Sequence, residues 1–256
     1  TKLKATGVHL AMSIMVFVYL AYQIYYNWYP EPYFSIDGGW QGIRIIAAVD
    51  LVLGPLLTLI VYKPNKPRLK MDLTIIGIIQ AAALGWGLWV VHHERPIATV
   101  YAEGAFSSVT ANKMTILGMT EDKLKAFGER TPVWIYSKLP DDPDALQEIR
   151  VRAAQSGRGV HFETEFYTPM DKTAREKIIS EKLNVEAWIK DRPEFKQTYE
   201  KFVKRYEAQM DDIIFIPWLA RHGRNIVALN KEDLSYIATL DIRPPEVDEE
   251  KPEYRS

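Results

Sequence analysis

The sequence predicts a membrane protein with three N-terminal transmembrane α-helices followed by a mixed α+β domain outside the membrane. Two observations lead to this fold class: three long apolar segments near the N-terminus, and an uneven distribution of charge. Residues 1–95 hold 8 of the 32 Lys and Arg residues and 5 of the 33 Asp and Glu residues. We therefore expect a transmembrane domain at 1–95, an α+β domain at 96–243 and a disordered acidic tail at 244–256.

The overall composition excludes several classes of function. The formal net charge is −1 and the sequence pI is about 6.5, so we expect no nucleic-acid partner. The chain has no cysteine, which excludes disulfides, thiolate metal sites and cysteine catalysis.

The three apolar segments, residues 8–26, 45–62 and 73–91, each approach the ~20 residues that a helix needs to cross ~30 Å of hydrocarbon. A single such segment is compatible with a buried core helix, but three of them joined by short polar loops indicate membrane spans. The first contains four tyrosines and no small-residue cleavage site. We interpret it as a retained anchor instead of a signal peptide.

The loops between these segments predict the orientation. Residues 27–42 contain no Lys or Arg, whereas Lys63, Lys66, Arg68 and Lys70 lie between the second and third segments. Basic loops stay in the cytoplasm, so we expect the N-terminus and the basic loop inside, and residues 27–42 and the α+β domain outside. Aromatic residues expected near the outer interface agree: Tyr25, Tyr26, Trp28, Tyr29, Trp40, Trp86 and Trp89.

The second apolar segment contains an acid and a helix breaker. Pro55 lacks the N–H that a helix requires, so we expect a kink near residues 51–54. Asp50, Gly54 and Thr58 are spaced four residues apart and therefore share one helix face. Gly54 also leaves room for a close neighbouring helix.

Asp50 has a predicted partner on the third segment. Gln80 should differ from Asp50 by only ~4–5 Å in height, so we expect a hydrogen bond between them. His9, Thr58 and Asp72 are expected to form a second polar layer near the inner surface. A carboxylate inside the membrane costs ~2.5–3.5 kcal/mol and marks a functional hypothesis, here bundle packing or contact with a partner helix. The alternative is an acid at the outer interface, held by Arg44 or water.

Residues 96–243 show alternating strand and helix patterns. Glu103-Gly104 predicts a hairpin turn, and Asp142-Pro143 predicts the start of a helix. The expected strands are 97–101, 105–110, 133–136, 213–220, 225–229 and 236–242. The expected helices are a short one from Thr120 to Phe127 and longer ones at 142–157, 171–189 and 194–210.

Catalytic and metal-binding patterns are weak. The adjacent residues His92-His93-Glu94 point in different directions on a helix, so we interpret them as an interfacial cluster. The loop at 156–159 has no P-loop lysine, and no Ser-His-Asp or paired-carboxylate arrangement is visible. We predict that the protein is not an enzyme and that it uses no metal or cofactor.

A set of motif residues lies along residues 7–101. In chain order they are His9 with Ser13, Trp28-Tyr29-Pro30, Pro32, Val49-Asp50, Gly54-Pro55-Leu56-Leu57-Thr58-Leu59, Lys63, Lys66, Asp72-Leu73, Gln80, Ala83-Leu84 and Arg95-Pro96. This set resembles the TfpX/TfpZ family of type IV pilin accessory proteins from Gram-negative bacteria. The string D-x-x-x-G-P-L-L-T-L is its most specific part. Five matched positions fall at the outer interface: Trp28, Tyr29, Pro30, Arg95 and Pro96.

The resemblance implies a bacterial inner-membrane protein with a periplasmic domain. Its expected role is that of a chaperone-like, non-catalytic factor that stabilises a type IV pilin, the major pilin, and promotes its assembly into pili. The implied partners are this pilin, the lipid bilayer and other pilus assembly machinery. We expect the face formed by Asp50, Gly54 and Thr58 to pack within the bundle or against the pilin helix.

Two alternatives from other classes stay open. One is a membrane-anchored extracytoplasmic sensor or ligand-binding protein, which is weakened because the expected cytoplasmic side offers no output module. The other is an oligosaccharide transferase acting on pilin, which we would expect to have more spans and a metal site.

Overall fold

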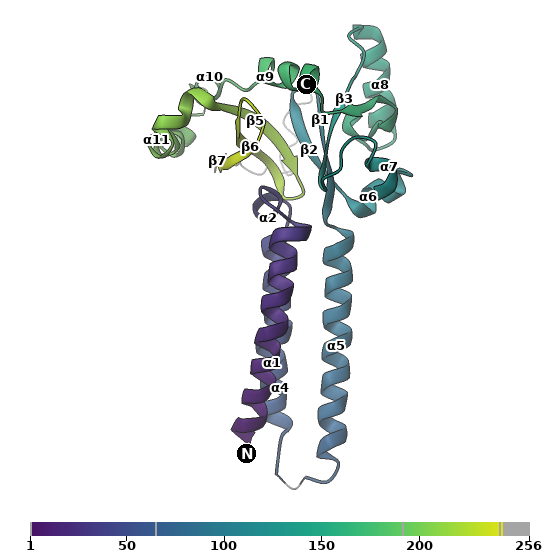
Figure 1. The fold of residues 1–256 in the computed structure, drawn as a ribbon, viewed down its shortest axis with the longest axis vertical. Coiled ribbons are helices and arrows are strands. Elements are labelled where there is room, and N and C mark those ends of the chain that lie inside the picture. The colour runs from purple at the N-terminus through teal and green to yellow at the C-terminus, as the bar shows by residue number, and fades with distance from the viewer. Residues whose placement is uncertain (1, 65, 191, 241, 243–256) are drawn as a thin grey trace, which may run out of the picture.

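The computed structural model describes residues 2–64, 66–190, 192–240 and 242. It shows a long helical bundle that carries a seven-stranded mixed sheet with shorter helices around it (Figure 1). This arrangement confirms the predicted fold class. The acidic tail expected at 244–256 lies outside the described residues.

Three helical segments form the bundle. In chain order their parts are α1 (Lys2–Tyr22), the π-helical η1 (Gln23–Trp28), α3 (Gly39–Ile46), the π-helical η2 (Ala47–Leu53), α4 (Gly54–Val61) and α5 (Leu69–His93). By length and composition, each segment is long and apolar enough to cross a membrane. Each begins earlier than predicted, because the helices continue beyond the purely apolar residues.

The backbone disturbance expected before Pro55 takes the form of the π-helical segment η2. At its end the N–H of Gly54 bonds to the carbonyl of Val49, five residues earlier. Gly54 and Pro55 are both buried. The step from Gly54 to Pro55 therefore faces other helices, which suits an irregular backbone inside hydrocarbon.

A short helix, α2 (Tyr33–Ile36), connects the first two helical segments and lies directly beneath the sheet (Figure 1). The sequence did not indicate this packing. Tyr29, Tyr33 and Ile36 are buried in the same hydrophobic cluster as Trp218 of the sheet. The core thus passes without interruption from the bundle into the α+β part.

The sheet has the strand order β4-β3-β1-β2-β5-β6-β7. Its strands are β1 (Pro96–Ala102), β2 (Ala105–Thr110), β3 (Val133–Ser137), β4 (Tyr167–Pro169), β5 (Ile213–Ala220), β6 (Gly223–Asn230) and β7 (Tyr236–Leu240). Strand β1 pairs in parallel with β3, and β2 pairs in parallel with β5, whereas the other pairs are antiparallel. The edge strand β4 was not predicted.

The helices of the α+β part differ from the prediction in number and in length. They are α6 (Ala111–Ile116), α7 (Glu121–Leu124), α8 (Pro143–Gln155), α9 (Lys172–Ser180), α10 (Val185–Lys190) and α11 (Lys196–Arg205), with 3-10 turns η3 (Val160–Phe162), η4 (Thr164–Phe166), η5 (Pro193–Phe195) and η6 (Glu207–Asp212). The single helix expected at 171–189 is wrong, because the chain breaks between α9 and α10. There the N–H of Leu183 donates to the carbonyl of Phe215 (2.8 Å), and the side chain of Asn184 caps α10. The helix expected at 194–210 is likewise shorter and flanked by η5 and η6.

Candidate functional site

A groove lies between α1 and α5 in the membrane-spanning bundle. It has a volume of about 460 Å³, and η2 and α4 also contribute to its lining. Helix α4 packs against both α1 and α5, and α5 stands apart from α1 over much of its length (Figure 1). Most of the lining is apolar. Its polar members are His9, Ser13, Asp50, Thr58 and Gln80.

Two hydrogen bonds connect α1 to the second helical segment at this groove. One joins His9 Nδ1 and Thr58 Oγ1 over 2.7 Å, and in the other the hydroxyl of Ser13 donates to Asp50 Oδ1 over 3.1 Å. Ser13 and Thr58 are almost fully buried, with 3% and 4% of their surface exposed. The predicted face of Asp50 and Thr58 therefore contacts α1, and Ser13 is a partner that was not expected.

The predicted hydrogen bond between Asp50 and Gln80 is wrong. Gln80 lies over Gly54 instead, where its Nε2 atom would be only 2.0 Å from an added Cβ. The prediction compared heights along the bundle, and height does not fix the direction in which a side chain points. Asp50 Oδ2 and Gln80 Nε2 are both buried and have no hydrogen-bond partner among the described residues. Buried polar atoms without partners are rare and require an explanation.

The inner polar layer forms only in part. His9 reaches Thr58, but Asp72 forms an ion pair with Lys66 of the basic loop, with 2.6 Å between Nζ and Oδ2. Asp72 belongs to the first turn of α5, where a carboxylate is favoured by the helix dipole. Asp72 is therefore paired with the basic loop and does not form a layer with His9 and Thr58.

The matched positions that we expected at the outer interface connect the ends of the helices. The hydroxyl of Tyr29 donates to the carbonyl of Val91 (3.0 Å), and Arg95 donates to the carbonyl of His92 (2.6 Å). The ring of Trp28 packs edge-on against His92, with 5.0 Å between centroids. These contacts fix the upper end of α5 against η1.

Two of the matched prolines, Pro30 and Pro96, lie at or just before the start of an element. The carbonyl of Pro30 accepts the N–H of Tyr33 (2.9 Å) just before α2. Pro96 is the first residue of β1, and its neighbour Arg95 forms an ion pair with Glu121. Both prolines therefore serve the connection between the bundle and the sheet.

The side chains of His92, His93 and Glu94 contact different partners and do not form one shared site. The ring of His93 lies against Trp89, with 4.2 Å between centroids, and Glu94 pairs with Arg221 at 3.5 Å. In the part of the chain that the structure describes, no group of three or more His, Asp or Glu side chains is arranged to hold a metal ion.

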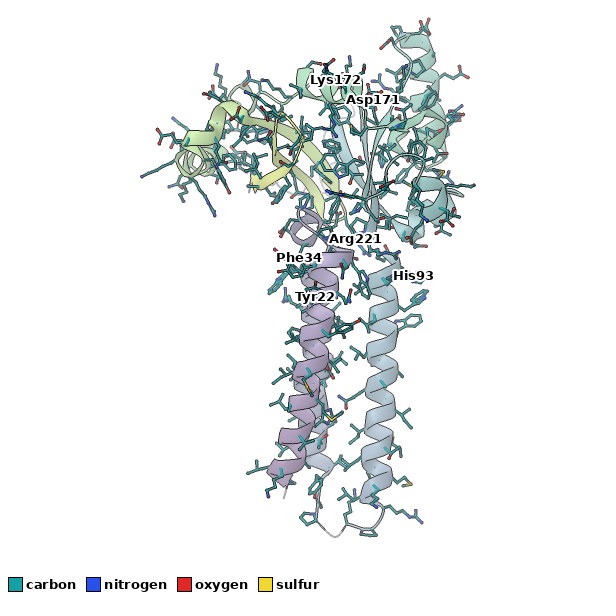
Figure 2. The ribbon with its side chains drawn as sticks, viewed as in Figure 1. Tyr22, Phe34, His93, Asp171, Lys172 and Arg221 are labelled. Atoms are coloured by element: carbon teal, nitrogen blue, oxygen red, sulfur yellow. The ribbon has the colours of Figure 1, made fainter. Side chains whose placement is uncertain are left out.

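Sequence reasoning missed a buried carboxylate where the bundle meets the sheet. Asp37 is only 4% exposed, and it accepts hydrogen bonds from the Ser108 hydroxyl (2.6 Å) and the Arg221 N–H (2.8 Å). Burial raises the pKa of Asp37 to about 6, although both hydrogen bonds oppose this rise. Figure 2 shows Arg221 at this junction, above the end of α5 marked by His93. In the sequence, Asp37 is only an acid in a loop that contains no Lys or Arg, and nothing there indicates that it is buried.

The network around Asp37 continues into the core of the sheet. The indole N–H of Trp218 donates to the hydroxyl of Ser108 (2.8 Å), and the ring of Tyr33 packs edge-on against Trp218. Tyr33 also shares a 2.6 Å hydrogen bond with Thr99. Burial raises the pKa of Tyr33. We call the set Tyr33, Asp37, Thr99, Ser108 and Trp218 the junction network.

Together these features define a class of protein. It is a membrane-anchored protein whose three-helix bundle has an open groove with polar side chains, and whose loop between the first two helical segments is packed into the core of an α+β domain.

Comparisons with known proteins assign the family. The profile described as fimbrial assembly protein FimB matches residues 1–38. Three fimbrial assembly proteins of Dichelobacter nodosus are each 38% identical to this chain over 101 residues, which is 38% of the chain. The match covers 76% of the protein of serogroups C1 and C2, and 39% of those of serogroups E1 and I. The chain belongs to the fimbrial assembly protein family. No solved structure matches it.

Proposed function

We propose that this protein is an accessory factor of type IV pilus assembly that binds a pilin in the membrane and keeps it stable until assembly. Membership of the fimbrial assembly protein family supports a role in pilus assembly. The resemblance to the TfpX/TfpZ family supports the finer role of a pilin-specific, chaperone-like protein. In this proposal the protein is not an enzyme and needs no cofactor.

The observation that carries the proposal is the groove between α1 and α5. Its apolar walls suit a transmembrane helix, and its polar atoms Asp50 Oδ2 and Gln80 Nε2 have no partner in the described chain. Hydrocarbon offers such atoms no hydrogen bond. A helix of the pilin that enters the groove would cover the walls and supply hydrogen-bonding groups. Gly77 and Ala81 line the groove, and small residues allow two helix backbones to approach closely.

We also propose that the protein lies in the bacterial inner membrane, with the N-terminus and basic loop in the cytoplasm and the sheet in the periplasm. The charge asymmetry of the loops supports this orientation. The contact between α2 and the sheet requires both to lie on one side of the membrane. Single cysteines at the exposed positions Ser35 and Lys66 should label from opposite sides, Ser35 from the periplasm.

Site-specific photocrosslinking in living cells tests the binding site. A photoreactive amino acid replaces Ala81, which lines the groove, or Ala83, which is exposed on the same helix but does not line it. We expect a crosslink to the pilin, identified by mass spectrometry, from position 81 and not from position 83. Equal crosslinking from both positions, or none from position 81, would contradict the proposal.

The variant Asp50→Leu adds a second readout. Interhelical hydrogen bonds in membranes average only ~0.6 kcal/mol, so this variant should accumulate to a normal level. If Asp50 contacts the pilin, crosslinking from position 81 should fall. A low protein level would instead assign Asp50 to packing within the bundle.

A further inference from the structure

A cleft in the α+β part forms a second candidate binding site, separate from the groove. Its volume is about 440 Å³, within the range of small-ligand sites. Four separate pieces of the chain line it: the start of α2 with the loop before it, the residues around the start of β3, helix α9, and the turn between β6 and β7 with the first residue of β7. The residues that matter here are Glu31, Tyr33, Arg130, Trp134, Arg175, Asp233 and Tyr236.

The aromatic part of the cleft is held in place by the core. Trp134 packs against Phe106 and Trp218, with centroid distances of 4.9 and 5.7 Å. The hydroxyl of Tyr33 is bonded to Thr99, and that of Tyr236 shares a 3.1 Å hydrogen bond with Thr239. The tyrosine hydroxyls are thus already used, so these rings offer a ligand mainly apolar surface.

The charged side chains of the cleft differ in how they are occupied. Glu31 accepts hydrogen bonds from the Ser35 hydroxyl at 2.8 and 2.9 Å, and Asp233 accepts one from the Ser235 N–H at 2.8 Å. The guanidinium groups of Arg130 and Arg175 form no hydrogen bond or ion pair with another residue that the structure describes.

The charge of Arg175 nevertheless acts on the nearby Asp233. Hydrogen bonding by Ser235, and then the nearby charge of Arg175, lower the pKa of Asp233. Each guanidinium carries five N–H donors in a planar fork that matches a carboxylate and stacks on aromatic rings. The two arginines are therefore the open recognition groups of the cleft.

We propose that this cleft binds a peptide segment that carries a carboxylate beside an aromatic side chain. The carboxylate pairs with Arg130 and Arg175, and the aromatic ring packs on Trp134 and Tyr236. The lining contains two cations and two anions, which suits a singly charged carboxylate better than a doubly charged phosphate. The acids Glu31 and Asp233 lie where they can accept amide N–H groups of the segment.

Calorimetric titration of the purified full-length protein in detergent micelles tests this inference. The probes are acetyl-Gly-Phe-Glu-amide and its neutral isostere acetyl-Gly-Phe-Gln-amide. We expect the acidic peptide to bind about tenfold more tightly, because a hydrogen bond between charged groups contributes at least the free energy that corresponds to a tenfold change in affinity. The double variant R130Q/R175Q should remove this preference. R158Q, which changes an exposed arginine outside the cleft, should leave it unchanged.

Three results would overturn the assignment. They are equal affinity for the two peptides, no binding of either at millimolar concentration, and an unchanged preference in R130Q/R175Q. Stronger competition by inorganic phosphate than by acetate would replace the peptide with a phosphate ligand and so also contradict it. None of these outcomes depends on the pilin groove, which is tested separately by crosslinking.

Discussion

The junction network and the intramembrane groove contain similar polar side chains, but they differ in how those side chains are satisfied. At the junction Asp37, Ser108 and Trp218 bond to one another or to the backbone in a closed set. In the groove Asp50 and Gln80 each leave a buried atom without a partner among the described residues. A satisfied network holds a fold together, whereas an unsatisfied one indicates a missing partner.

Packing around the glycines distinguishes the junction from α5. A Cβ added to Gly39 near the junction would lie 2.5 Å from Phe34, and one added to Gly42 would lie 3.3 Å from Val91. On α5, a Cβ added to Gly77 or Gly85 would meet nothing within 4 Å. The junction is closely packed, and much of α5 is open to lipid or to another helix.

The largest effect is expected from a substitution in the junction network. Trp218→Ala removes a fully buried ring and the donor to Ser108. We expect a loss of about 3–5 kcal/mol in the free energy of unfolding, as for other buried aromatic residues. Thermal unfolding in detergent, followed by circular dichroism, measures it.

Trp86→Ala is the matched control for this change. Trp86 is 68% exposed on α5, so its replacement should shift the unfolding temperature far less. Equal shifts for Trp218→Ala and Trp86→Ala would show that the junction is not the stabilising region.

The second prediction concerns the pH dependence of the junction. Burial raises the pKa of Asp37 to about 6, from the 3.8 that is ordinary for an aspartate. The folded state therefore holds this proton more tightly than the unfolded state, and the contribution of Asp37 to stability is greatest below about pH 4 and is lost as the pH rises through about 6. The difference is on the order of 3 kcal/mol.

Asp37→Asn isolates this contribution, because the amide does not titrate. The difference between the unfolding free energies of the wild type and of Asp37→Asn should change only between about pH 4 and 6. The wild type should lose stability relative to the variant as the pH rises in that window. A constant difference across the window would mean that Asp37 titrates normally.

The smallest expected effect sharpens the comparison inside the membrane. Gly54→Ala places a Cβ against Gln80 Nε2 and 3.0 Å from His9 Nε2. Because Gln80 is flexible and can swing aside, we expect a loss of only about 1 kcal/mol in bundle stability. Steric trapping in lipid bilayers measures it. Gly85→Ala meets open space and should be neutral or slightly stabilising.

If Gly54→Ala has no more effect on bundle stability than Gly85→Ala, then Gln80 does not lie over Gly54, and the packing described between these two residues is incorrect.

Much of the fold follows from the sequence for physical reasons. Long apolar segments and a loop without Lys or Arg mark the membrane spans. The strands β2 and β5 have their predicted bounds because period-two and β-branched patterns are local signals. The break between α9 and α10 depends on the hydrogen bond from Leu183 to Phe215. That contact joins residues far apart in the chain, although Asn184 offered a capping signal.

The candidate site was predictable in composition but not in pairing. Asp50, Thr58 and Gln80 all line one groove, as their positions on helix faces suggested. Which of them bond to one another depends on how the helices are rotated, and the sequence alone does not fix that rotation. Ser13 therefore appeared only as a motif residue. Asp37 looked like an ordinary loop acid because its burial depends on distant strands, and its partner Ser108 lies 71 residues further along the chain.

The packing of α2 against the sheet also sets an order for biogenesis. The core around Trp218 includes Tyr33 and Ile36, which lie between the first two helical segments. The sheet cannot complete this core until the loop has reached the same side of the membrane. A secreted fragment beginning at residue 96 would lack these side chains and expose their binding surface to proteases. Insertion of the first two helices is thus required before the part of the core around Trp218 can be completed.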